Sequence, residues 1–331
     1  MKQKALVIGG TGFLGRYLVE ELLQEDYDVS VLCRNQPEEW PFEEIKFYLG
    51  SIEDAFIVNE AISGKDVVFH LAAKAGVWGT YDSYYGPNVR GTKLIIEACD
   101  QHKVPQLIYT STPSVVLSNK EVINGNENLP IPSHFFNNYQ KTKSIAEQLI
   151  INANSDRLKT VAIRPQAIWG DGDVHVFPRI LQKLKNGSLR IVGSGTNKIS
   201  VAFVKNVAWA HVLAAKSDGI GGNVYFINDE KPVNPWQWIK DNTSLLKYEM
   251  SSRKIPKSIA YGLSGIVEFI YKIFSIESEP PFTRYMVCEV SNNHYFSIEK
   301  AKNDFGYYEK YALDTGQKEF QKYLVELNKT L

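Results

Sequence analysis

A glycine-rich turn near residue 9 constrains the fold of this chain more than any other stretch. Residues 5–8 form a continuous apolar run, which is typical of a strand buried on both faces of a parallel sheet. Gly9, Gly12 and Gly15 follow at a spacing that permits a tight turn, a close approach to a pyrophosphate and close packing of the next helix. That helix would point its free N–H groups at the phosphates. A purely structural turn is the alternative, but the position between a strand and an amphipathic helix favours dinucleotide binding.

Strand and helix patterns alternate through the first half of the chain and predict an α/β protein with a Rossmann-type doubly wound parallel sheet. Further strands are expected at 29–32, 45–49, 66–70, 106–110, 160–163 and 224–227, and a loop at 119–132. We expect a dinucleotide-binding domain over 1–168, with 200–228 returning to it. Residues 169–199 and 229–331 lack the regular alternation and are expected to form a smaller C-terminal substrate-binding lobe.

Composition excludes several classes of function. The 331 residues include 37 basic and 37 acidic side chains and no basic stretch, so no nucleic-acid partner is expected. The three cysteines are far apart, which argues against a disulfide framework or a zinc cluster, and no metal site is expected. Because the first strand begins at about residue 4, there is no room for a signal peptide, and we expect a cytoplasmic protein.

One apolar stretch, 258–274, could touch a membrane without crossing it. Glu268 and Lys272 interrupt it, and it is shorter than the roughly 20 residues that a spanning helix needs. We expect a buried or surface-lying helix, and peripheral membrane contact is one role for it. The sequence leaves the oligomeric state open, a homodimer included.

A position just past the end of the second expected strand selects the cofactor in dinucleotide-binding folds. An acidic residue there binds the ribose 2′-hydroxyl, whereas an arginine accommodates a 2′-phosphate. Arg34 holds this place, and 29–36 contain no Asp or Glu, so NADP(H) is favoured and NAD(H) is the alternative. An ordinary surface arginine is the other interpretation of Arg34.

A tyrosine and a lysine four residues apart open the helix after the fifth strand. Tyr139 and Lys143 share one helical face, so the cation would lower the pKa of the phenol and let it exchange a proton with a carbonyl or an alcohol. Such pairs are common on solvated helices, but this one follows the glycine-rich turn and a hydroxyl cluster at 110–114. Asn88 lies inside another expected helix and should have a polar partner. His70 is expected to be a hydrogen-bonded structural histidine rather than a catalytic one.

With these motifs the chain resembles the extended short-chain dehydrogenase/reductase superfamily, and within it the 3β-hydroxysteroid dehydrogenase-like branch. The motifs that carry the resemblance are 9–15, 70–73, 88–92, 109–112, 139–143 and 164–165. Segments 74–79 and 168–173 look most like bacterial 2-alkyl-3-oxoalkanoate reductases. Ser51 departs from the family, which usually has Asp there, so the adenine contact is expected to be weaker.

The resemblance implies a role for each residue of the expected catalytic set. Tyr139 would donate the proton in reduction, and Lys143 would lower the pKa of Tyr139 and hold the nicotinamide ribose. Thr112, with Ser111 as the alternative, would steady the substrate oxygen. Asn88 would hold a water molecule that bridges to Lys143.

Two larger sets of residues are expected to bind the cofactor and the substrate. The cofactor set comprises Gly9, Thr11, Gly12, Phe13, Leu14, Arg34, Ser51, Ile52, Leu71, Ala72, Ala73, Thr110, Tyr139, Lys143, Pro165, Ala167 and Ile168. The substrate set comprises Val77, Trp78, Tyr85, Ser114, Phe135 and Trp169, most of them aromatic or apolar loop residues that suit a flat or long apolar molecule.

The resemblance therefore implies an NADP-dependent oxidoreductase that reduces a 3-oxo group, or oxidises a 3-hydroxyl, on a hydrophobic substrate. A 2-alkyl-3-oxo fatty acid and a steroid are both candidates. A nucleotide-sugar epimerase or dehydratase is an alternative, but such enzymes usually have a polar, arginine-rich pocket where this chain has aromatic residues. A non-catalytic NADP-sensing protein is the third interpretation, although a sensor has no need of a proton donor.

Overall fold

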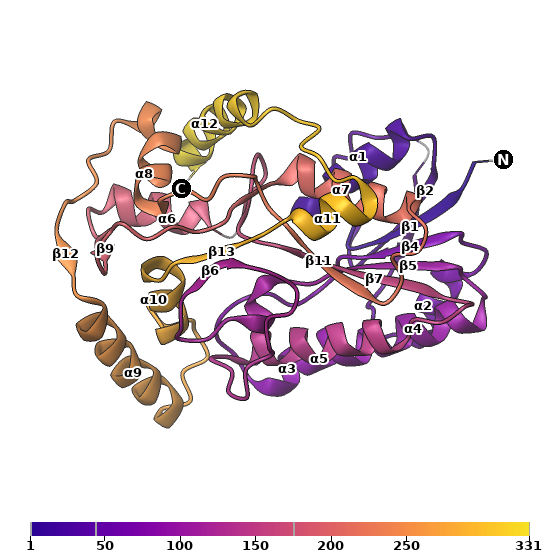
Figure 1. Cartoon of the computed structure of the whole chain (residues 1–331), viewed down its shortest axis with the longest axis horizontal. Coiled ribbons are helices and arrows are strands. Elements are labelled where there is room, and N and C mark those ends of the chain that lie inside the picture. The colour runs from indigo at the N-terminus through magenta and orange to yellow at the C-terminus, as the bar shows by residue number, and fades with distance from the viewer. Residues whose placement is uncertain (1, 44, 175, 331) are drawn as a thin grey trace.

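A seven-stranded parallel sheet forms the centre of the molecule (Figure 1). The computed structural model describes residues 2–43, 45–174 and 176–330. The strands of the sheet are β1 (Lys4–Ile8), β2 (Asp28–Cys33), β3 (Lys46–Leu49), β4 (Val67–His70), β5 (Gln106–Thr110), β7 (Lys159–Pro165) and β11 (Asn223–Ile227). They lie in the order β11-β7-β5-β4-β1-β2-β3, and each neighbouring pair is parallel. This arrangement confirms the predicted Rossmann-type class and makes β1 and β4 the point where the strand order reverses.

Helices cover both faces of the sheet, as Figure 1 shows. One face carries α1 (Phe13–Gln24) and α7 (Val204–Lys216), which pack against each other. The other face carries α2 (Ala55–Ile62), α4 (Gly91–Gln101) and α5 (Asn138–Asn152). Because strands covered on both faces must be apolar on both sides, this layering explains the continuous apolar runs of the sequence.

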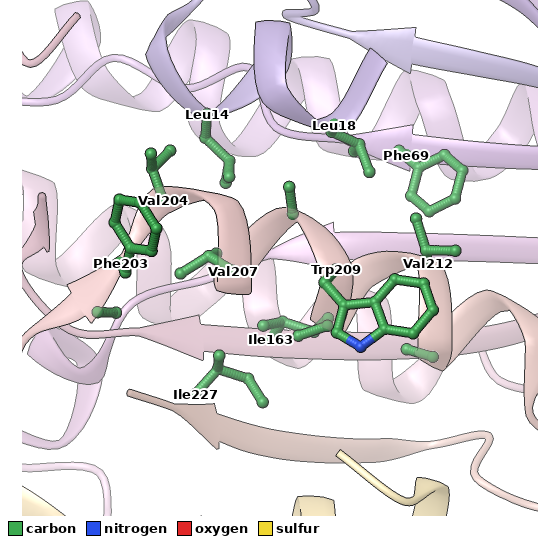
Figure 2. Packing of buried hydrophobic residues seen from close by; sticks show 14 of the residues in the cluster. Leu14, Leu18, Phe69, Ile163, Phe203, Val204, Val207, Trp209, Val212 and Ile227 are labelled. Carbon is green, nitrogen blue, oxygen red and sulfur yellow. The ribbon is translucent and has the colours of Figure 1, made fainter. Parts of the chain in front are cut away.

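Figure 2 shows how the first helical layer packs on the sheet. Leu14 and Leu18 of α1 lie opposite Val207 and Val212 of α7, and Ile163 of β7 lies beside them. Four of these side chains are fully buried and Leu14 is 8% exposed. Each such burial contributes about 1.5–3 kcal/mol, so this layer holds the glycine-rich end of α1 rigidly against the sheet.

Most of the remaining elements lie at the carboxyl ends of the strands, whereas α11 (Glu299–Phe305) packs against β11 near α7 (Figure 1). The other helices are α3 (Tyr81–Tyr85), α6 (Phe177–Lys185), α8 (Pro235–Asn242), α9 (Lys257–Ile273), α10 (Arg284–Ser291) and α12 (Leu313–Thr330). The short strands form three separate parallel pairs. They are β8 (Ile168–Trp169) with β10 (Ala202–Phe203), β9 (Ile191–Val192) with β12 (Lys254–Ile255), and β6 (Val122–Gly125) with β13 (His294–Phe296). The division into two domains stays a prediction.

Strand β6 corrects the expectation of a loop over 119–132. Its residues are a poor strand sequence by themselves, with Asn124 in the left-handed region at φ 50° and Gly125 at the end. The strand forms because β13 supplies a partner, and Phe296 stacks on Phe226 beside it with ring centroids 4.3 Å apart. A partner this distant in sequence leaves no local signal.

Helix α9 is the surface-lying helix expected from the apolar stretch 258–274. It packs chiefly against α10, at the periphery of the molecule in Figure 1. Its apolar residues are exposed, among them Leu263 at 50%, Ile266 at 58% and Phe269 at 64%. Over the described parts of the chain, no helix combines the length and the apolar character that crossing a bilayer requires.

Candidate active site

The glycine-rich turn has the geometry that its sequence predicts. Gly9 adopts φ +87°, and a Cβ atom there would lie 2.9 Å from the backbone nitrogen of Ala72. A Cβ atom on Gly15 would lie 2.2 Å from the carbonyl oxygen of Gly9, so α1 can approach the turn only with glycine at this position. No side chain caps α1 at Gly12, which leaves N–H groups of the first turn for an anion.

Other expected cofactor residues lie at the same edge of the sheet. Leu71 and Ala72 follow β4 and both donate backbone hydrogen bonds to the Ile8 carbonyl, at 3.0 Å each. Arg34 follows β2, is exposed, and makes no ion pair with any described residue. Ile52 packs close to Gly91. These placements fit a dinucleotide: a bare helix N-terminus for phosphates and a free guanidinium beyond β2.

The chain from β7 to β8 closes this edge. Pro165 ends β7 and Ile168 begins β8. Between them, Ala167 lies in the left-handed region at φ 39°, which costs energy for a residue with a Cβ atom. Tyr17 of α1 holds the loop beyond β8 by donating to the carbonyl of Asp171 at 2.9 Å.

Tyr139 and Thr112 form the centre of the candidate catalytic site. Tyr139 stands in the first turn of α5, which Asn137 caps by accepting a hydrogen bond from the Gln140 amide at 2.8 Å. Burial raises the pKa of Tyr139 to about 12, and the nearby Thr112 hydroxyl acts in the opposite direction. The expected effect of Lys143 on the pKa of this phenol stays a prediction.

Lys143 is instead bonded to the end of β5. Its Nζ donates to the Tyr109 hydroxyl at 2.6 Å and to the Thr110 carbonyl at 2.7 Å, and lies 4.1 Å from the centroid of the Tyr109 ring. The side chain is only 2% exposed. Burial lowers the pKa of Lys143 to about 7, although the nearby Glu147 carboxylate acts in the opposite direction.

The structure separates the two candidate hydroxyls that follow β5. Ser111 is buried and donates to Glu147 at 2.7 Å. That carboxylate also accepts two hydrogen bonds from Arg164, at 2.6 and 2.8 Å, in a fully buried ion pair. Thr112 is the hydroxyl beside Tyr139, and its Oγ1 lies 3.1 Å from the Ser114 hydroxyl. The geometry favours Thr112 for contact with a substrate oxygen; its catalytic role stays a prediction.

Asn88 has the polar partners that its place in a helix suggested. It lies in a π-helical turn, Gly86–Arg90, between α3 and α4. Its Oδ1 accepts from the Lys74 amide at 2.7 Å, and its Nδ2 donates to the Lys74 carbonyl and the Thr142 hydroxyl, each at 3.1 Å. Both donor hydrogens of the amide are thus in use, and the proposed water bridge to Lys143 stays a prediction.

His70 is a structural histidine, as expected. It is fully buried, and its Nε2 lies 3.0 Å from the Thr92 hydroxyl, which itself donates to the Asn88 carbonyl at 2.7 Å. Burial lowers the pKa of His70 to about 3, so the ring is neutral at physiological pH.

A cleft of about 960 Å³ opens at the start of α5, where Asn137, Asn138 and Lys141 line it; Tyr139 and Thr112 are not among its described lining residues. Three of the expected substrate residues, Val77, Trp78 and Phe135, line it. Trp78 also ties the cleft to the C-terminal helices, since its indole donates to the Ile276 carbonyl at 2.9 Å and its ring packs against Tyr271. Tyr285 lines the cleft and is 2.8 Å from the Ser114 hydroxyl, which connects the cleft to Thr112.

The other expected substrate residues do not line this cleft. Trp169 is 3% exposed, packs on Phe203 and Phe320, and donates to the buried Asp229 carboxylate at 2.8 Å. The structure therefore places Trp169 in the hydrophobic core. The Tyr85 ring packs against the Tyr81 ring instead. The Ser114 hydroxyl is hydrogen-bonded to the Tyr285 hydroxyl, and of these two residues Tyr285 is the one that lines the cleft.

Sequence reasoning missed three residues of the site. Tyr84, rather than Tyr85, lies near Tyr139, with ring centroids 6.5 Å apart, and donates to the Trp78 carbonyl. A signal existed, because Tyr84 precedes Asn88 by four residues and so shares its helical face. Lys74 and Tyr285 also face the cleft, and nothing local in the sequence indicates that they do.

Comparison with known proteins identifies relatives over nearly the whole chain. Residues 6–255 match the 3-beta hydroxysteroid dehydrogenase/isomerase family. The 2-alkyl-3-oxoalkanoate reductase of Shewanella oneidensis is 35% identical, over 95% of this chain and 84% of its own length. The decarboxylating sterol-4-alpha-carboxylate 3-dehydrogenase of Mus musculus is 33% identical, over 92% of this chain and 86% of its own.

Solved structures share the same fold. The protein MoeE5, in complex with UDP-glucose and NAD, superposes with a TM-score of 0.74 at 21% identity, covering 98% of this chain and 99% of its own. At that level of identity the likeness concerns the fold alone.

Proposed function

The chain belongs to the 3-beta hydroxysteroid dehydrogenase/isomerase family and is an NAD(P)-dependent oxidoreductase, and from that premise we propose that it interconverts a 3-oxo and a 3-hydroxyl group on a hydrophobic substrate. The observation that carries the proposal is the place of Tyr139 in the first turn of α5, beside Thr112 and next to Asn138, which lines a partly aromatic cleft. A hydroxyl pair can hold a carbonyl oxygen and deliver a proton to it. The names of both relatives describe carboxylated substrates with chemistry at carbon 3, so a 2-alkyl-3-oxo fatty acid is the first candidate and a steroid the second.

We propose NADP(H) as the cofactor. The turn at Gly9–Gly15 would hold the pyrophosphate, Arg34 the 2′-phosphate, and Lys143 the nicotinamide ribose. The cofactor, when bound, supplies or accepts the hydride. The protein supplies orientation, a general acid in Tyr139 and a buried cation in Lys143. Because burial brings the pKa of Lys143 to about 7, the group carries its charge when protonated and can exchange a proton near neutral pH.

We further propose that α9 rests on a lipid surface from which an apolar substrate enters. Its outer face exposes Ile259, Leu263, Ile266, Phe269, Ile270 and Ile273, while Tyr271 and Lys272 line the cleft. The basic residues Arg253, Lys254 and Lys257 precede the apolar face, a pattern that suits anionic headgroups. Sedimentation with anionic vesicles tests this: Phe269→Glu should stay in the supernatant, whereas Ile123→Glu, at another exposed site, should bind like the wild type.

A substrate panel tests the proposed reaction. NADPH and NADH are first titrated by fluorescence, and cofactor oxidation is then followed with long-chain 3-oxo acids, 3-ketosteroids and UDP-glucose. We expect turnover with one of the first two classes and none with the nucleotide sugar. Turnover of UDP-glucose alone would assign the chain to the epimerase or dehydratase alternative, and cofactor binding without any turnover would favour a sensor.

A further inference from the structure

The charges that line the cleft are predominantly positive. Lys74, Lys141 and Lys272 line its wall, and none of them pairs with a carboxylate in the part of the chain that the structure describes. Glu268 is neutralised by Arg284, which contacts it at 2.7 Å, so Glu277 is the remaining acidic group of the described lining. Like charges that share a cleft repel one another and attract an anion.

Lys74 differs from the other two lysines in the residues that surround it, since they include Asn88 and Tyr84. The Asn88 side chain accepts a hydrogen bond from the Lys74 backbone N–H at 2.7 Å and donates one to the Lys74 carbonyl at 3.1 Å. These two bonds fix the position of the Lys74 Cα relative to α5. Its ammonium group lies 5.0 Å from the centroid of the Tyr84 ring, and the Tyr84 ring neighbours that of Tyr139. The Tyr84 ring therefore links the Lys74 ammonium group to the candidate proton donor, Tyr139.

We propose that Lys74 binds a carboxylate of the substrate, and that this contact makes the protein select 3-oxo acids over neutral 3-ketones. The proposal rests on the proposed function and narrows its substrate class. A single ammonium suits a carboxylate that lies a few bonds from the reacting carbonyl. The apolar part of the molecule would extend along Val77, Trp78 and Phe135, and Lys141 and Lys272 would attract the anion to the cleft.

Kinetics with a matched pair of substrates test the proposal. A long-chain 2-alkyl-3-hydroxy acid and its methyl ester differ in the charge of the carboxyl group and by one methyl group, and both can be oxidised with NADP⁺. We expect Lys74→Met to lower kcat/KM for the acid by about tenfold or more, mainly through KM, and to leave the ester unaffected. Lys74→Arg should retain the preference for the acid. Lys93→Met, an exposed site on α4, should behave as the wild type with both compounds.

If Lys74→Met lowers kcat/KM equally for the acid and the ester, or lowers it for neither, the assignment of Lys74 as the carboxylate site is overturned. Binding of non-reacting ligands separates this result from a failure of the proposed function. Palmitate should quench tryptophan emission, to which Trp78 in the cleft contributes, at lower concentration than hexadecanol, and Lys74→Met should abolish the difference. Loss of that difference without turnover of any hydroxy acid would support the carboxylate site and refute the reaction. Loss of UDP-glucose binding alone in Lys74→Met would make the site a diphosphate site and refute the proposal.

Discussion

The Lys143 ammonium donates to the Tyr109 hydroxyl at 2.6 Å, and this bond joins the helix that carries Tyr139 to the end of β5. Tyr109 is 1% exposed, so the bond lies in the interior. A lysine whose pKa is lowered in the folded state, here from 10.5 to about 7, makes folding pH-dependent. Between these two values the unfolded chain binds more protons than the folded one, so the stability contributed by this group rises with pH across that window and is flat below it.

Replacing Tyr109, which accepts a hydrogen bond from Lys143, should shift the pH range over which the stability of the protein rises. In Tyr109→Phe the ammonium keeps the Thr110 carbonyl but loses a hydrogen bond, which should destabilise the protein by about 1.5–3 kcal/mol near neutral pH and lower the pKa of Lys143 further. Urea unfolding at a series of pH values measures both effects. The rise of stability with pH should begin below about pH 7 in the variant, and should vanish in Lys143→Met. If the dependence of stability on pH is unchanged in Tyr109→Phe, the Tyr109 hydroxyl does not set the pKa of Lys143.

Tyr139→Phe should remove the proton donor with little change in the fold. The hydroxyl is placed next to Thr112, and loss of a general acid typically lowers turnover by about 10²–10⁴-fold. NADPH affinity, measured by fluorescence, should be retained. Tyr308→Phe serves as the matched control, because this tyrosine is 54% exposed, packs against Trp209 and is not among the described residues that line the cleft. Full turnover in Tyr139→Phe would contradict the proposed mechanism.

The two hydroxyls after β5 should separate into one catalytic and one structural role. Thr112→Val should lower kcat by about 10²–10³-fold, because it removes the group that holds the substrate oxygen, and should change the melting temperature little. Ser111→Ala should retain kcat and lose about 1.5–3 kcal/mol of stability, since its hydroxyl donates to a buried carboxylate. Steady-state kinetics and thermal unfolding of both variants decide the matter, and a reversed pattern would transfer the catalytic role to Ser111.

Arg34 should discriminate NADPH from NADH. Its exposed guanidinium follows β2 and is free to meet a 2′-phosphate, so Arg34→Ala should weaken NADPH binding by about tenfold or more and leave NADH binding unchanged. Fluorescence titration with both cofactors gives the ratio. Arg157→Ala, another exposed arginine, controls for a change in net charge. If NADPH binding and NADH binding weaken equally, Arg34 does not discriminate between the two cofactors at the 2′-phosphate.

Several features of this protein could be predicted from the sequence because they are set by neighbours within one turn or one strand. The apolar run before Gly9 and the glycine spacing depend on local backbone geometry, and the structure has the turn with Gly9 at φ +87°. The pair Tyr139 and Lys143 opens one helix as predicted, because a spacing of four is a property of the helix itself.

The tertiary structure alone decided which partner each side chain meets. The sequence pattern paired Lys143 with Tyr139, whereas in the structure it bonds Tyr109 of β5. Trp169 was expected to contact the substrate, but Phe203 and Phe320 enclose it in the core. Lys74 faces the cleft because Asn88, on another element, holds its backbone. Periodicity reports which side of an element is apolar, but hydrogen bonds and burial depend on segments far away in the chain, and these leave no mark on the local pattern.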